Sequence, residues 1–265
     1  MCLVAVKYFP QMSSWVGIKN RDRSSKPLIR VRKSFRRGVE RLYIWDDSTK
    51  YTEGINEFGV SILSAGFDAE RDTVDGLAIR TALFEQTPEL AAQKIFDLRV
   101  RGRTYIFTKE KAFVVHIEDD NGTPVNMVNM QLSPSDPHVF ISTEGPMDEF
   151  ERWKVAMKET KLSRNATELL DGMSVTDAEN PQDNPLIIDT KRRSMRTIGQ
   201  TMIIPSEMTM HYRAIWGDVR FRLDKLNSPS EKTFFEIVSN RRLINFGEQF
   251  EIADNDNLIE EKGEM

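Results

Sequence analysis

The sequence predicts an α+β fold, because short strand-like runs alternate with two pairs of helical segments along the 265 residues. Strand patterns fill the first third, and two helices, further strands, two more helices and a closing pair of strands follow. This order is typical of two stacked sheets with helices outside, although the pattern alone also allows other α+β layouts. We expect a single domain over residues 1–247.

The strands of the first third are short apolar or β-branched runs bounded by polar or turn residues. They are predicted at Leu3–Tyr8, Trp15–Lys19, Leu28–Val31, Leu42–Trp45 and Gly59–Ser64. Apolar residues then recur at spacings of three and four in Leu77–Phe84 and Leu90–Leu98, which predicts two helices. Pro88 stands where the second of them should begin.

The rest of the chain repeats both patterns. A hairpin is predicted from Thr104–Phe107 to Ala112–Ile117, with further strands at Val125–Met130 and His138–Ser142. Helical patterns cover Met147–Met157 and Ala166–Met173, an exposed loop covers Asp177–Pro185, and the last strands are Gln200–Ile204 and Met208–Ile215. Residues 248–265 are acidic and poor in apolar residues, which predicts a disordered tail.

Composition limits the function classes. The formal net charge is −4, and the basic residues are spread along the chain, so no nucleic-acid partner is expected. No run approaches the ~20 apolar residues of a membrane helix, so no membrane partner is expected either. One cysteine cannot form an internal disulfide, which favours a reducing compartment and a cytoplasmic location. Whether the chain forms a homo-oligomer is left open by the sequence.

The single cysteine is Cys2, and removal of Met1 would give it both a thiol and a free α-amine. A thiol titrates near ~8.5 and an α-amine near ~7.7–8.0, so both are partly reactive at neutral pH. The amine can accept the thiol proton, the thiol can attack an amide carbonyl, and the resulting thioester can be hydrolysed by water. The alternative is that Cys2 is a small buried hydrophobe at the start of a strand.

Three motifs in order resemble a known superfamily. Met1-Cys2-Leu3-Val4, Gly17-Ile18-Lys19-Asn20-Arg21-Asp22 and Gly54-Ile55-Asn56-Glu57-Phe58-Gly59-Val60 are similar to the cysteine-type N-terminal-nucleophile hydrolases related to choloylglycine hydrolase and penicillin V acylase. Asn20-Arg21-Asp22 followed by Lys26-Pro27 also resembles the Asn-Arg-Asp-Glu (NRDE) proteins of the same fold. The resemblance extends to about Gly217 and implies a four-layer αββα sandwich of two antiparallel sheets.

The resemblance implies roles for residues near Cys2. Asp22 matches the family's acidic residue that holds the α-amine, and Asn20 is expected to assist it. Lys19 matches the family's cation near the thiol, usually an arginine, and Arg21 is the alternative because strand alternation puts both on one face. The alternative for Asp22 is a solvated residue at the end of a strand.

Three further positions depart from the family pattern or match it loosely. Gly66 falls where the family has an oxyanion-stabilising Asn, so only its backbone N–H can donate. Thr143 stands at the place of a second Asn, although an ordinary strand-end threonine would look the same. Arg196 is our choice for the position of the family's distal arginine. The alternative is that the charged run containing it is a solvent-exposed surface.

No cofactor or metal is expected. The three histidines lie far apart, with no second ligand at metal-binding spacing, and no phosphate loop is present. The first functional hypothesis is therefore an amidohydrolase that cleaves a non-peptide N-acyl amide of a small molecule through a thioester on Cys2. The alternatives are an acyltransferase using the same thioester and a non-catalytic protein that retains the fold for binding.

Overall fold

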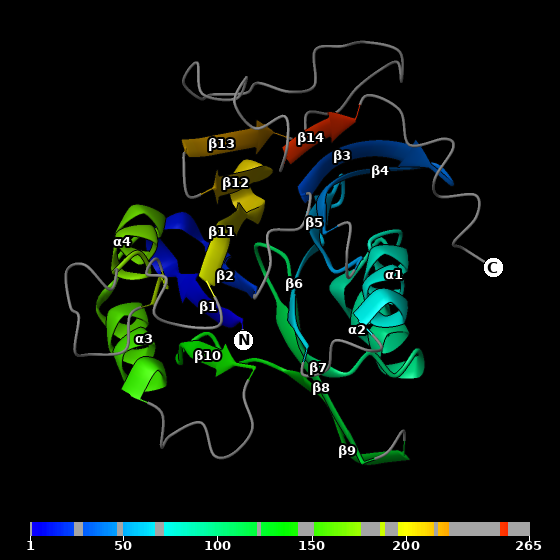
Figure 1. Ribbon diagram of the computed structural model, residues 1–265, viewed down its shortest axis with the longest axis horizontal. Coiled ribbons are helices and arrows are strands. Elements are labelled where there is room, and N and C mark those ends of the chain that lie inside the picture. Colours follow the sequence, from blue (N-terminus) through cyan, green and yellow to red (C-terminus); the bar gives the residue numbers. More distant parts are fainter. Residues whose placement is uncertain are drawn as a thin grey trace.

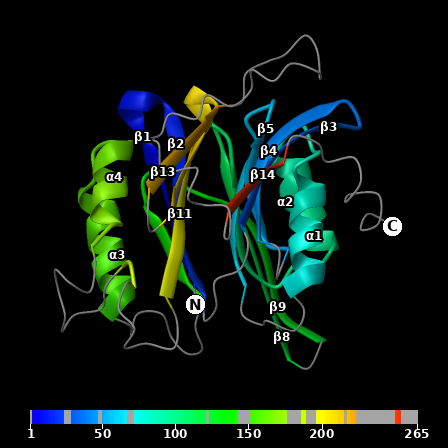
Figure 2. The ribbon, with the colours of Figure 1, turned by 45° about the horizontal axis from the view of Figure 1, so that its top comes forward.

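The computed structural model describes residues 2–23, 29–46, 50–66, 72–120, 123–142, 151–175, 186–188, 196–214, 217–222 and 250–253. Two sheets stack face to face, and a pair of helices covers the outer face of each (Figures 1 and 2). The αββα sandwich predicted from the motifs is confirmed. The predicted loop Asp177–Pro185 lies outside the described residues.

The first sheet has the strand order β10-β1-β2-β11-β12-β13, with every neighbouring pair antiparallel. Its neighbouring strands β1 and β2 are joined by the short 3-10 turn Pro10–Met12, and they carry the first two motifs. The bounds are β10 His138–Ile141, β1 Leu3–Phe9, β2 Ser14–Arg23, β11 Arg196–Ile204, β12 Thr209–Ala214 and β13 Gly217–Arg222.

The second sheet has the order β14-β3-β4-β5-β6-β7-β8-β9. Its pairs are antiparallel except for β14, which runs parallel to β3. The bounds are β14 Phe250–Ala253, β3 Ile29–Arg36, β4 Val39–Asp46, β5 Thr52–Asn56, β6 Ser61–Ala65, β7 Gly102–Phe107, β8 Ala112–Asp120 and β9 Thr123–Gln131. Residues 248–265 were predicted to form a disordered tail, and four of them, in strand β14, pair with β3. For residues 254–265 the prediction stays untested.

Helices α1 (Asp72–Ala82) and α2 (Pro88–Asp97) cover the second sheet, and α3 (Glu151–Leu162) and α4 (Ala166–Gly172) cover the first (Figure 2). Pro88 is the first residue of α2, as predicted, and the hydroxyl of Thr87 caps this helix by accepting a hydrogen bond from the backbone of Leu90. Asn165 caps α4 through the backbone of Glu168 in the same way.

Apolar residues fill all three spaces between the layers. One cluster lies between each sheet and its helices, and a third lies between the sheets and includes Cys2. Gly17 of β2 has a packing role here, because a Cβ at this position would lie 2.5 Å from the ring of Phe107 and 2.7 Å from Leu63. Its missing side chain lets the two sheets approach each other closely.

Candidate active site

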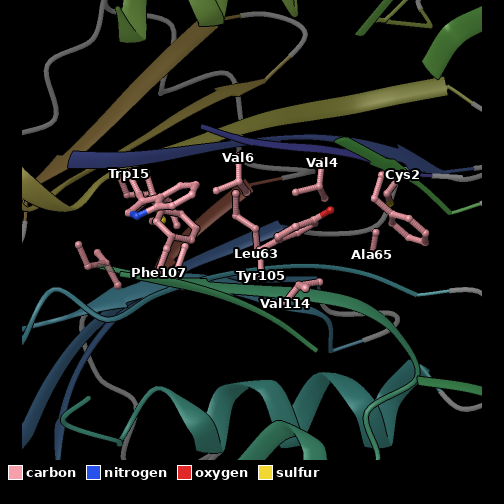
Figure 3. Packing of buried hydrophobic residues seen from close by; sticks show 14 of the residues in the cluster. Cys2, Val4, Val6, Trp15, Leu63, Ala65, Tyr105, Phe107 and Val114 are labelled. Carbon is pink, nitrogen blue, oxygen red and sulfur yellow. The ribbon is translucent and has the colours of Figure 1, made fainter. Parts of the chain in front are cut away.

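Cys2 lies at the start of β1 with its thiol buried between the two sheets, and only 4% of the residue is exposed. Figure 3 shows it beside Ala65 at one end of the inter-sheet cluster, while Trp15 and Phe107 lie at the other end. Its backbone is fixed by Ser142, whose N–H donates to the Cys2 carbonyl at 2.9 Å. The nitrogen of Cys2 donates to the Ser142 hydroxyl at 2.6 Å.

Strand β2 presents two different rows of side chains. Lys19 and Arg21 lie on the face between the sheets, where both contact Glu53 of β5. Asn20 and Asp22 lie on the opposite face, where they bind groups of the α3 and α4 layer. This follows from the alternation of side chains along a strand, and it separates residues that are adjacent in the motif.

Glu53 joins the two inward cations. Its carboxylate forms ion pairs with Lys19 and, at 2.5 Å, with Arg21, and all three side chains are at most 1% exposed. Burial raises the pKa of the Glu53 carboxyl, but the charges of Arg21 and Lys19 outweigh burial and hold this pKa below its ordinary value. Burial lowers the pKa of the Lys19 ammonium, and the charge of Glu53 opposes this effect.

Arg23 is the cation that contacts the thiol. Its Nη1 lies 3.8 Å from the Sγ of Cys2 and also donates to the backbone carbonyl of Asp22 at 3.3 Å. Burial raises the pKa of the Cys2 thiol, but the positive charges of Lys19, Arg23 and the chain's N-terminus together outweigh burial and the charge of Asp22, so the net pKa is lowered. Lys19 and Arg21 were the cations predicted for this role, and continued alternation along β2 could have pointed to Arg23.

We therefore expect Arg23→Gln to slow alkylation of the thiol at neutral pH by several-fold, because one of the positive charges that lower the thiol pKa is lost. Since the chain has one cysteine, the rate of iodoacetamide labelling reports this thiol alone. The matched control is Arg164→Gln, whose side chain is 80% exposed and pairs with Glu168. Equal labelling rates in both variants across the pH range would contradict the assignment.

Asp22 is buried, and the described groups that bind its carboxylate come from other elements. Arg152 of α3 donates to Oδ2 at 2.7 Å, and the hydroxyl of Thr197 donates to Oδ1 at 2.6 Å. The second Nη of Arg152 donates to the carbonyl of Leu186 at 2.8 Å. Among the described contacts, only the backbone carbonyl of Asp22 reaches Cys2, 4.0 Å from Sγ. The predicted hydrogen bond from the Cys2 nitrogen to this carboxylate is not present while Met1 is attached.

Asn20 takes part in a different set of contacts. Its amide donates to the carbonyls of Met173 at 3.0 Å and Leu186 at 2.8 Å, and its oxygen accepts from Gln200 at 2.8 Å. Within the described part of the chain its side chain does not bind the nitrogen of Cys2. Asn20 therefore ties the end of α4 and residues 186–188 to the sheet, a contact between distant segments that the motif could not reveal.

Gly66 directly follows β6, and the space beside it is occupied. A Cβ there would lie 2.1 Å from the hydroxyl oxygen of Tyr51, so a side chain at this position would require Tyr51 to move. The ring of Tyr51 in turn lies beneath Lys19, with Nζ 5.6 Å from the ring centroid. The proposed donation from the Gly66 backbone stays a prediction.

Two predicted site residues remain, and the structure describes neither side chain. Thr143 lies outside the described residues, directly after Ser142. Arg196 is the first residue of β11, and its backbone pairs with Arg23 of β2, which brings it to the Cys2 end of the sheet. Its side chain is outside the described set.

Within the described ranges, no group of three or more His, Cys, Asp or Glu side chains could hold a metal ion. In the same ranges, no helix is long and apolar enough to cross a membrane.

Comparison with known proteins identifies the fold. No protein-family model and no curated protein sequence matches the chain. The structure of penicillin V acylase from Agrobacterium tumefaciens matches with a TM-score of 0.51 at 12% identity, covering 84% of this chain and 86% of that chain. The C2A mutant of conjugated bile acid hydrolase from Clostridium perfringens matches with a TM-score of 0.53 at 11% identity, covering 96% and 99%. The chain has the N-terminal-nucleophile hydrolase fold that its motifs implied.

Proposed function

We propose that the chain is a cysteine amidohydrolase that cleaves a non-peptide N-acyl amide bond of a small molecule. The observation that carries this proposal is the buried thiol of Cys2 at the start of β1, with Arg23 at 3.8 Å and Lys19 nearby to favour the thiolate. The likeness to an acylase and to a bile acid hydrolase supports the same class, since both names describe amide cleavage outside peptides. These two structures share their fold with this chain, at sequence identities of 12% and 11%.

The proposed reaction begins after Met1 is removed, when the nitrogen of Cys2 becomes a free amine. This amine accepts the thiol proton, and Sγ attacks the amide carbonyl to form a tetrahedral oxyanion. The ammonium then returns the proton to the leaving nitrogen, and the C–N bond breaks to give a thioester. A water deprotonated by the same amine hydrolyses the thioester, which releases the acid and restores the thiol.

The oxyanion needs donors directed at it, and the backbone N–H of Gly66 is the predicted one. Gly66 has no side chain, and the hydroxyl of Tyr51 lies where its Cβ would be, so this position offers no side-chain donor. The departures from the family pattern at Gly66, Thr143 and Lys19 favour a second candidate, a protein that keeps the fold for binding but has lost turnover. An acyltransferase would use the same thioester and differ only in the acceptor that attacks it.

Intact mass and labelling separate these candidates. We expect purified protein to lack Met1 and a cysteine-directed acylating probe to add one acyl group, which Cys2→Ala abolishes. A panel of N-acyl compounds should then give turnover, with an added amine competing with water only if the chain is an acyltransferase. Retention of Met1 in native protein would exclude the mechanism, because an amide nitrogen cannot serve as the base.

A protein that has lost Met1 and labels at Cys2, yet hydrolyses none of the panel, would favour the binding candidate.

A further inference from the structure

The nitrogen of Cys2 has a well-placed partner that the motifs do not indicate. It donates to the hydroxyl oxygen of Ser142 at 2.6 Å, across 140 positions of the chain, and both residues are buried. The Ser142 hydroxyl in turn lies 3.4 Å from the carbonyl of Cys2, to which it donates. This direction turns the hydroxyl hydrogen toward the carbonyl and leaves an oxygen lone pair for the Cys2 nitrogen.

The register of the first sheet fixes this contact. Leu3 of β1 pairs with Ile141 of β10, so Cys2 and Ser142 lie opposite each other one position further along. The backbone N–H of Ser142 donates to the carbonyl of Cys2 at 2.9 Å and continues the ladder. These backbone bonds do not involve Met1, so the nitrogen of Cys2 should keep its place after Met1 is removed.

The Asp22 carboxylate already has two partners, and neither is the nitrogen of Cys2. Its two carboxylate oxygens are bound by Arg152 at 2.7 Å and Thr197 at 2.6 Å, on the helix-facing side of β2. Cys2 and Ser142 belong to the other face, since Cys2 packs between the sheets and Ile141 packs toward the helices.

We propose that Ser142, rather than Asp22, holds the free α-amine of Cys2 by accepting one of its hydrogens, so that the nitrogen lone pair is directed at the thiol proton. This rests on the proposed function, in which the α-amine is the base. Asp22 then acts indirectly. Its carboxylate pairs with Arg152, and its backbone carbonyl helps to position Sγ of Cys2 and the side chain of Arg23.

A neutral hydroxyl suits this task chemically. A carboxylate in contact with the amine would favour the ammonium form strongly, whereas a hydroxyl oxygen orients the amine with a much smaller effect on its basicity. The amine can then accept the thiol proton near neutral pH, and as an ammonium it keeps one hydrogen on Ser142 while another is passed to the leaving nitrogen.

The test compares Ser142→Thr with Ser142→Val, two side chains of the same shape that differ in the hydroxyl. Because Cys2 is the only cysteine, growth on [¹³C]cysteine labels one residue, whose Cα and Cβ shifts follow the amine and the thiol during a pH titration. We expect Thr to retain the wild-type amine titration and Val to lower the amine pKa by about half a unit to one unit. The value of kcat/KM for an amide should fall about tenfold in Val and stay near wild type in Thr.

Ser142→Ala serves as a second hydroxyl-free variant if Val disturbs folding, and intact mass confirms Met1 removal in each protein. Indistinguishable titrations and kcat/KM values in the Thr and Val variants would overturn the role of Ser142 while leaving the proposed function in place. Absence of turnover with the difference in titration retained would instead overturn the proposed function and leave the amine held by Ser142. A chain that keeps Met1 overturns both.

Discussion

Replacing Cys2 with Ala is expected to lower turnover of any N-acyl amide substrate by about 10⁴-fold or more, because the only atom that can form the thioester is removed. The fold should survive, since alanine is smaller than cysteine and the rest of the inter-sheet cluster stays in place. The measurements are kcat/KM on the best amide of the panel and the melting temperature. Mass spectrometry of quenched reactions should show the acyl adduct only in the wild-type protein.

Val6→Ala is the matched control for this experiment. Val6 belongs to the same buried cluster and lies on the same strand, but it carries no reactive group. We expect this variant to lose about 1–3 kcal/mol of stability and to retain the acyl adduct and most of the turnover. Turnover that persists in Cys2→Ala, or that is lost equally in Val6→Ala, would contradict the role of the thiol.

Replacing Glu53 with Gln is expected to lower the free energy of unfolding by about 3–5 kcal/mol, because the buried side chains of Lys19 and Arg21 then lose the carboxylate that both contact. The reason is the cost of removing one partner from a buried ion pair, and not the strength of the ion pairs themselves. Urea unfolding measures the change. Glu89→Gln is the control, because its ion pair with Lys111 is about half exposed and should contribute less than ~1 kcal/mol.

The same residue predicts a dependence of stability on acid. The pKa of Glu53 is lower in the folded protein than in the unfolded chain, so its stabilising effect is present above the unfolded pKa of ~4.3 and is lost as the pH falls through the folded pKa. Wild-type stability should therefore fall more steeply below about pH 4.3 than that of Glu53→Gln. Parallel curves for the two proteins in this range would show that Glu53 is not ionised in the fold.

Much of the fold could be predicted because its elements carry local patterns. The first two strands, the helix that begins at Pro88, the 104–117 hairpin and the closing hairpin all appear where apolar periodicity and turn residues placed them. Strand β5 is different: it contains Glu53, a charged residue that is fully buried, and it was recognised only as part of a motif. A local pattern treats such a residue as exposed, since its burial depends on two cations from another sheet.

The candidate site was predicted less completely. Cys2 and Lys19 follow from the motifs, and the charge of Lys19 does lower the pKa of the thiol. Arg152 and Ser142 were missed, because they lie about 130 and 140 positions from the residues they bind and carry no signal of their own. The resemblance implied that Asn20 and Asp22 hold the α-amine of Cys2, while in the sheet their side chains face the helices.

The sequence alone determined which kind of chemistry is open to this chain, because a sole cysteine at position 2 and the strand-borne motifs after it are local features. Only the tertiary structure decided which groups surround that cysteine. Side chains alternate along β2, so residues one position apart are directed into different layers, and the register of β1 against β10 brings Ser142 to the nitrogen of Cys2. Both are properties of paired strands, and pairing between distant segments is set by packing that no local stretch of sequence contains.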